Sequence, residues 1–165
     1  MTDGIFMLFT GIAALVLQTT SLAFLAPIDY KPDMILILVA WATLRMPFGV
    51  AAGFAFTAGI LIDLLSGAPT GLFALLYCLI FLTCGYCHAT LHLEGRVAQA
   101  VIIFGLTLAS GGIVLLMRWI SGPVGFGWKA AQWFFFKSVF TGLTSMLVFP
   151  VLERLRSGYT RLVGA

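Results

Sequence analysis

Charged side chains are scarce in this chain of 165 residues: nine Lys or Arg and six Asp or Glu make up 9% of it. Soluble domains carry about 25% charged residues, so the composition excludes an ordinary soluble domain. The mean hydropathy of +1.10 agrees with this. The basic residues are scattered singly and the net charge is only +3, which argues against nucleic acid binding. The sequence therefore indicates an integral membrane protein.

The residue groups of known catalytic sites are also missing from the sequence. It has no serine nucleophile beside a base, no pair of carboxylates within an apolar segment and no glycine-rich nucleotide loop. Its three cysteines, Cys78, Cys84 and Cys87, lie in one apolar segment, so we expect no disulfide framework. We predict a noncatalytic protein without a cofactor.

The segment 84–88, CGYCH, matches the pattern of c-type haem attachment, and His92 one turn later makes zinc a second reading. Haem of this type is attached outside the cytoplasmic membrane, whereas the topology proposed below places this segment at the cytoplasmic face. Ala89 stands where an HExxH metal site has its glutamate. We therefore interpret the cysteines as packing residues and the histidines as interfacial, with no metal.

Long apolar runs fill most of the chain. A helix needs about 20 residues to cross the hydrocarbon core, so six helices would take about 120 residues and leave only short loops. We predict an all-α integral membrane protein with six transmembrane helices in a single domain, residues 1–165. The predicted helices span about residues 4–26, 33–44, 47–66, 71–93, 97–120 and 130–152, and a basic cytoplasmic tail follows at 153–165.

The predicted helix 33–44 is too short to span the bilayer at 1.5 Å per residue. It ends at Arg45-Met46-Pro47, since proline cannot continue a helix without losing a hydrogen bond. A re-entrant segment is one alternative, and a tilted helix in a locally thinned bilayer is another.

The distribution of basic residues orients the predicted helices. With six spans and an inside N-terminus, the cytoplasmic side receives five arginines: Arg45, Arg96, Arg154, Arg156 and Arg161. The outer side receives three basic residues: Lys31, Arg118 and Lys129. Lys137 lies within a helix. By the positive-inside rule, this asymmetry predicts that both termini are cytoplasmic.

Small residues indicate which helix faces meet, because helices in lipid associate by close approach of their backbones. About a third of the circumference of helix 47–66 carries a candidate packing face: Gly49, Ala52, Gly53, Phe56, Gly59, Ile60 and Asp63. The opposite face is expected to contact lipid: Val50, Phe54, Ala58, Leu61 and Leu65. Two further stripes are predicted to pack: Gly105, Ala109 and Gly112, and the polar Lys137, Thr141 and Ser145.

Asp63 is a lone carboxylate in an apolar helix, where a charge at mid-membrane costs about 2.5–3.5 kcal/mol. We expect it to contact Lys137 or Arg118, or to cap backbone amides at the Gly67 turn. For Lys137, the alternative is that its amine reaches the outer headgroups along its own helix.

The stretch from Pro32 to Leu75 resembles the bacterial rod shape-determining protein MreD family. In that family a Pro-Asp pair opens a short helix and an Asp-Leu-Leu-Ser-Gly segment closes the next. The residues that carry the resemblance are Pro32, Asp33, Trp41, Arg45, Gly53, Gly59, Asp63, Gly67 and Gly71. Lys31 supplies the basic residue that many relatives have before the proline.

The resemblance implies a noncatalytic scaffold subunit of the rod complex, or elongasome, in the bacterial cytoplasmic membrane. Such a subunit supports MreB-guided lateral peptidoglycan synthesis and rod cell shape. The implied direct partner is MreC, a single-span protein, and the MreB filament, RodA and a penicillin-binding transpeptidase belong to the same complex. The implied fold resembles the substrate-binding component of energy-coupling-factor transporters. The residues expected either to dock the MreC helix or to pack helices within the bundle are Gly49, Gly53, Gly59, Asp63, Gly67 and Gly71.

The alternative function is a small-molecule-binding membrane subunit of an energy-coupling-factor-type transporter. Its pocket would open outward near Trp119, Trp128, Asp63 and Lys137. A third reading, a membrane enzyme or redox protein, rests on the cysteine and histidine segment alone.

Overall fold

The computed structural model describes residues 2–17, 32–66, 71–91, 95–121 and 128–163, and nearly all of them are helical. The helices are α1 (Thr2–Val16), α3 (Met34–Arg45), α4 (Phe48–Ser66), α5 (Leu72–Leu91), α6 (Arg96–Ser121) and α7 (Trp128–Val163). The prediction of an all-α protein is therefore confirmed.

Within the described residues, four helical segments are long and apolar enough to cross a membrane: Phe48–Ser66, Leu72–Thr90, Val97–Leu116 and Gln132–Tyr159. These spans establish a multi-pass membrane protein. Helices α1 and α3 are apolar but shorter, with 15 and 12 residues. The second half of the predicted first helix lies outside the described residues.

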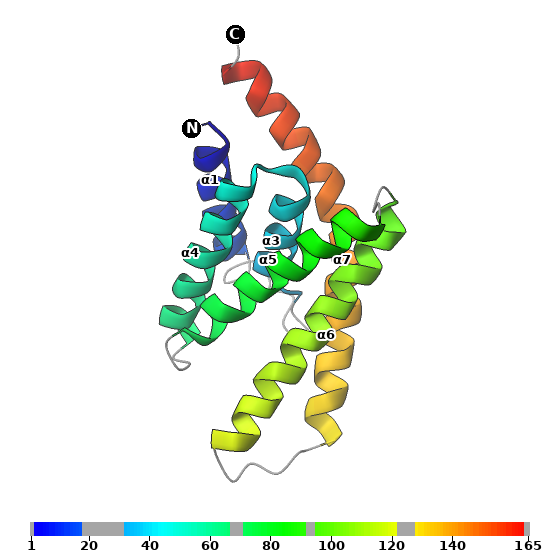
Figure 1. Ribbon diagram of the computed structural model, residues 1–165. Coiled ribbons are helices and arrows are strands. Elements are labelled where there is room, and N and C mark those ends of the chain that lie inside the picture. Colours follow the sequence, from blue (N-terminus) through cyan, green and yellow to red (C-terminus); the bar gives the residue numbers. More distant parts are fainter. Residues whose placement is uncertain (1, 18–31, 67–70, 92–94, 122–127, 164–165) are drawn as a thin grey trace.

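Helix α7 was predicted to end near residue 152, but in the structure it continues to Val163. Pro150 lies inside it and removes one backbone donor without ending the helix. The residues after it include Leu, Glu and Arg, which are good helix formers. Much of the predicted basic tail is therefore a helical extension, and Figure 1 shows it projecting beyond the other helices.

The short helix α3 occupies the centre of the bundle (Figure 1). Its residues from Ile35 to Ala42 are at most 2% exposed. It contacts α1, α4, α5, α6 and α7. Protein rather than lipid therefore covers α3, which explains how a helix of about 18 Å fits inside a membrane protein. It ends where Met46 becomes extended before Pro47.

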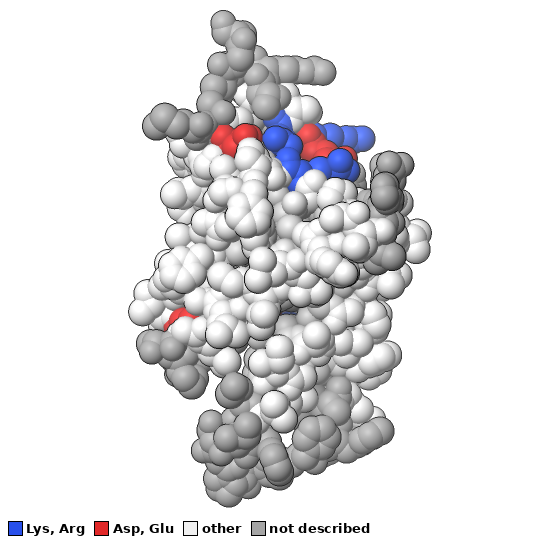
Figure 2. All heavy atoms as spheres, viewed as in Figure 1, with Lys and Arg blue, Asp and Glu red and all other residues white. Residues whose placement is uncertain are grey.

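Both ends of the chain lie at the same end of the bundle (Figure 1), and the visible Lys, Arg, Asp and Glu side chains gather mainly there (Figure 2). Arg45 Nη2 lies 2.7 Å from Glu153 Oε1. Arg156 donates to the Arg45 carbonyl at 2.7 Å and lies 3.5 Å from Asp3 Oδ1. These contacts join the start of α1, the end of α3 and the C-terminal part of α7.

Candidate functional site

Helix α4 carries two stripes of small residues, and the alanine stripe is the one that packs in the core. Ala51, Ala55 and Ala58 are buried, whereas Gly49 and Gly53 are exposed. The buried face is thus rotated by roughly 100°, one residue step, from the predicted face. Ala58 was predicted to face lipid but is buried. Phe56 and Ile60 were predicted on the packing face but are 52% and 38% exposed. Leu61 and Leu65 are exposed, as expected.

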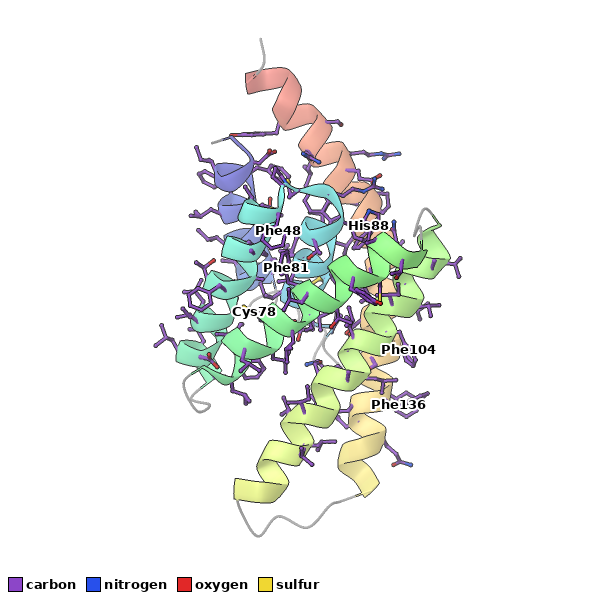
Figure 3. All side chains as sticks on the ribbon, in the orientation of Figure 1. Phe48, Cys78, Phe81, His88, Phe104 and Phe136 are labelled. Atoms are coloured by element: carbon purple, nitrogen blue, oxygen red, sulfur yellow. The ribbon has the colours of Figure 1, made fainter. Side chains whose placement is uncertain are left out.

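Gly59 is the buried glycine of this helix, and it sits where α4 crosses α5. A Cβ atom at Gly59 would collide with Ala74, lying 2.8 Å from its backbone nitrogen and 2.9 Å from the Phe73 carbonyl oxygen. The contact is with backbone, which cannot rotate away. Farther along the same pair, Phe48 and Phe81 pack edge to face with ring centroids 5.1 Å apart (Figure 3). Gly59 therefore serves packing within the bundle.

Asp63 caps the N-terminus of α5. Its Oδ1 accepts a hydrogen bond from the Phe73 amide at 2.8 Å, and its Oδ2 accepts from Gly71 and Ala74 at 2.9 and 3.2 Å. The positive end of the α5 dipole adds to this stabilisation of the buried carboxylate. Gly71 has a φ of +99°, a conformation that glycine adopts most readily. Asp63 was predicted to contact Lys137, Arg118 or backbone amides at the Gly67 turn. In the structure it binds backbone amides, just beyond that turn.

Asp33 caps α3 and forms a second polar cluster with α5 and α7. Its Oδ1 accepts from the Leu36 amide at 3.1 Å and from the Tyr77 hydroxyl at 3.4 Å. Lys137 Nζ lies 3.8 Å from Oδ2, and the Asp33 amide donates to Thr141 Oγ1 at 3.2 Å. Lys137 thus pairs with Asp33 rather than with Asp63. The sequence analysis missed Tyr77, although a tyrosine inside an apolar helix is itself a signal for a polar partner.

In the predicted polar stripe of α7, Thr141 and Ser145 are buried and Lys137 is partly buried, while Ser138, which was not predicted, is buried as well. Each hydroxyl donates to a carbonyl of its own helix. The predicted α6 stripe was wrong: Gly105, Ala109 and Gly112 are exposed in this chain. Instead, Gly111 faces the ring of Phe134 and Gly142 faces Phe104. Glycines at these two positions allow α6 and α7 to approach closely.

An apolar groove of about 610 Å³ separates part of α1 from α4. Four glycines line it, and α1, α3 and α4 contribute the larger side chains. The lining residues are Gly4, Met7, Leu8, Gly11, Ile12, Leu15, Ile35, Gly49, Val50, Gly53, Phe54, Thr57, Ala58 and Leu61. At Gly4, Gly49 and Gly53 an added Cβ would meet nothing within 4 Å. Two glycines of the predicted face, Gly49 and Gly53, therefore border an open groove.

The predicted glycine and aspartate face is therefore not one continuous surface. Gly49 and Gly53 border the groove, while Gly59, Asp63 and Gly71 hold α4 and α5 together. Gly67 lies outside the described residues. Of the remaining motif residues, Pro32 is buried beside the α3 cap and Trp41 is fully buried. Arg45 lies at the charged end, the end of the bundle where it pairs with Glu153 and where Arg156 pairs with Asp3.

Cys78 and His88 lie well apart along α5 (Figure 3). Cys84 is buried against α3, with its Sγ 3.9 Å from the Ala40 carbonyl oxygen. Cys78 and Cys87 are free thiols and His88 is exposed. Among the residues that the structure describes, no three His, Cys, Asp or Glu side chains form a metal-binding group. His92 lies outside that part of the chain.

Of the four residues proposed to line a pocket for a transported molecule, the structure describes the side chains of Asp63 and Lys137, which have different partners. Asp63 binds the start of α5, whereas Lys137 binds Asp33 and lies 5.7 Å from the centre of the Trp133 ring. The two side chains thus belong to separate clusters. The side chains of Trp119 and Trp128 lie outside the described residues.

The helices, the buried α3 and the paired intramembrane charges define a multi-pass α-helical membrane protein. The family described as rod shape-determining protein MreD matches residues 2–157. The chain belongs to this family, which confirms the resemblance seen in its sequence and makes it a rod shape-determining membrane protein. No curated protein and no solved structure shows significant similarity to it.

Proposed function

We propose that this protein is a noncatalytic scaffold of the rod complex and that it binds the transmembrane helix of MreC in the groove between α1 and α4. The observation that carries the proposal is the groove itself, which is apolar and bordered by glycines on both helices. Helices in lipid associate through such small-residue surfaces, where backbones approach closely. The family membership directs the choice of partner.

The position of the groove favours a helix from the bilayer as its occupant. Exposed apolar side chains flank it on both helices, including Leu8 and Ile12 on α1 and Leu61 on α4, which are 59%, 51% and 46% exposed. These side chains would contact lipid when the partner is absent. A second apolar helix would cover them without burying any charge, since the groove-lining residues carry none.

The charged end supports an orientation for the rest of the complex. It carries Arg45, Arg154 and Arg156 and lies where both chain termini lie. By the positive-inside rule we assign this end to the cytoplasm of a bacterial inner membrane. There it would face the membrane-associated MreB filament, while RodA and its transpeptidase complete the complex that builds the lateral peptidoglycan wall.

We extend the proposal to the fold, with all six helices within the bilayer as in the substrate-binding component of energy-coupling-factor transporters. Four described spans and two shorter apolar helices support this. Helix α3 need not cross alone, because its neighbours cover it.

The test is co-purification with MreC after Gly53→Leu, which places a large side chain in the groove. Gly105→Leu is the matched control, since both glycines are exposed in helices and neither Cβ would meet a neighbour. We expect Gly53→Leu to reduce recovered MreC by at least about tenfold, the effect of roughly 1.4 kcal/mol. Gly105→Leu should leave it unchanged.

Both variants should elute as the wild type does in size-exclusion chromatography, which separates lost binding from misfolding. Full recovery of MreC with Gly53→Leu would overturn the assignment of the groove. Loss of MreC with Gly105→Leu alone would move the docking face to α6.

A further inference from the structure

A second cavity lies at the charged end of the bundle, between α3 and α7. Its volume is about 460 Å³, and it is lined by Trp41, Arg45, Glu153, Arg156 and Ser157. Unlike the groove between α1 and α4, it is bordered mostly by charged and polar side chains. It therefore suits a polar ligand group.

Trp41 lines this cavity and carries a buried hydrogen-bond donor. The side chain is fully buried, and its Nε1 has no hydrogen-bond partner among the residues that the structure describes. Buried N–H groups are almost always paired, because leaving one without an acceptor is unfavourable. An indole N–H is a donor only, so its missing partner is an acceptor such as an anionic oxygen.

Arg45 supplies further donors from the end of the same helix. One of its terminal nitrogens contacts Glu153 at 2.7 Å. A guanidinium has five N–H donors in a planar fork that fits phosphate oxygens. The Arg45 side chain is 46% exposed, so a ligand can reach it. Arg156 is held beside it by its hydrogen bond to the Arg45 carbonyl.

We propose that this cavity binds the phosphate group of a membrane phospholipid. In this site Trp41 Nε1 and the Arg45 guanidinium donate to the phosphate oxygens. The charged residues that line the cavity are Arg45 and Arg156 against Glu153, one surplus positive charge, which favours an anionic headgroup such as phosphatidylglycerol.

A lipid is favoured over a free anion because the cavity lies at one end of a segment that is long and apolar enough to cross a membrane. That segment, Gln132–Tyr159, includes Glu153, Arg156 and Ser157 of the cavity lining. The headgroup would occupy the cavity while the acyl chains extend into the bilayer beside the bundle. The bound lipid would connect α3 to α7 independently of any partner in the groove.

The experiment is native mass spectrometry of the full-length protein in detergent with added dioleoyl phosphatidylglycerol. Dioleoylglycerol has the same chains without phosphate and serves as the control lipid. Trp41→Phe removes the N–H and keeps an aromatic ring, and Arg45→Gln removes the charge. Each variant should bind phosphatidylglycerol about tenfold more weakly, as expected for one charge-assisted hydrogen bond.

Arg154→Gln is the matched control, because Arg154 is exposed at the same end but does not line the cavity. It should bind the lipid nearly as the wild type does. Equal binding by wild type and Trp41→Phe would overturn the proposal, as would equal binding of dioleoylglycerol. Displacement of the lipid by an equimolar amount of inorganic phosphate would show that the site takes free phosphate rather than a lipid.

Discussion

Lys137 Nζ on α7 lies 3.8 Å from Asp33 Oδ2 at the start of α3. The two side chains are 22% and 15% exposed. Each charge alone would be unfavourable inside a membrane protein, and pairing offsets part of that cost. Because Asp33 also caps α3, this contact fixes the depth of the central helix relative to α7.

Removing either charge of this pair should destabilise the bundle. We expect Lys137→Met and Asp33→Asn each to lower the free energy of unfolding by roughly 1–3 kcal/mol, below the cost of breaking a fully buried pair because both groups are partly exposed. Asparagine still caps a helix, so Asp33→Asn tests the charge. The measurement is unfolding by dodecyl sulfate in mixed micelles.

The double variant, Lys137→Met with Asp33→Asn, should cost less than the sum of the single variants, since neither then leaves an unpaired charge. Arg154→Gln at the exposed end of α7 should change the stability little and is the control. Strict additivity of the two single changes would contradict the pairing.

Asp63 and Gly71 make a separate prediction about the start of α5. Asp63→Ala should lower the free energy of unfolding by about 2–3 kcal/mol, because three amides lose their acceptor. Asp63→Asn should cost less, since one side-chain oxygen remains. Hydrogen exchange of the peptide containing Gly71, Phe73 and Ala74 should become faster in Asp63→Ala. Unchanged exchange there would show that the carboxylate does not hold this helix end.

The sequence predicted the protein class, the four long spans and a backbone cap as one of three partners for Asp63. It could not predict which stripe of α4 is buried. Helix α4 is apolar all round, so no periodicity distinguishes its faces. Alanines lie on one stripe and glycines on the next, and either would permit close packing. The choice depends on neighbours: α3 and α5 cover the alanines, while α1 leaves the groove beside the glycines.

The sequence also could not predict that Lys137 pairs with Asp33. Asp33 adjoins the predicted loop before the short helix, which suggests a place at the membrane surface. The structure instead buries α3, and the N-terminus of that helix then lies within the bundle beside Lys137. The pairing follows from tertiary structure, because α3 and α7 are far apart in the chain.

Gly59 and Gly53 lie on the same helix, and alanine at the two positions should have effects of opposite sign. Gly59→Ala should destabilise the protein by at least about 2 kcal/mol, since its Cβ would overlap the backbone of Ala74. Gly53→Ala should be neutral or stabilising by up to about 1 kcal/mol, because alanine favours the helix and its Cβ meets nothing.

Thermal unfolding of both variants in the same detergent provides the comparison. This result would also explain why Gly59→Leu is unsuitable for testing MreC binding, although the sequence had suggested it as a docking residue. Equal stability of Gly59→Ala and wild type would refute the close crossing of α4 and α5.

The proposed orientation predicts which residues can be labelled from outside the cell. Ser66 ends α4 at the end of the bundle away from the chain termini, whereas Gly95 precedes α6 at the other end (Figure 1). Single cysteines should be placed at these positions after Cys78, Cys84 and Cys87 are changed to alanine. A membrane-impermeant maleimide should label Ser66→Cys in intact spheroplasts and Gly95→Cys only after permeabilisation. The reverse pattern would place both termini outside and would separate the arginines of the charged end from the cytoplasmic filament.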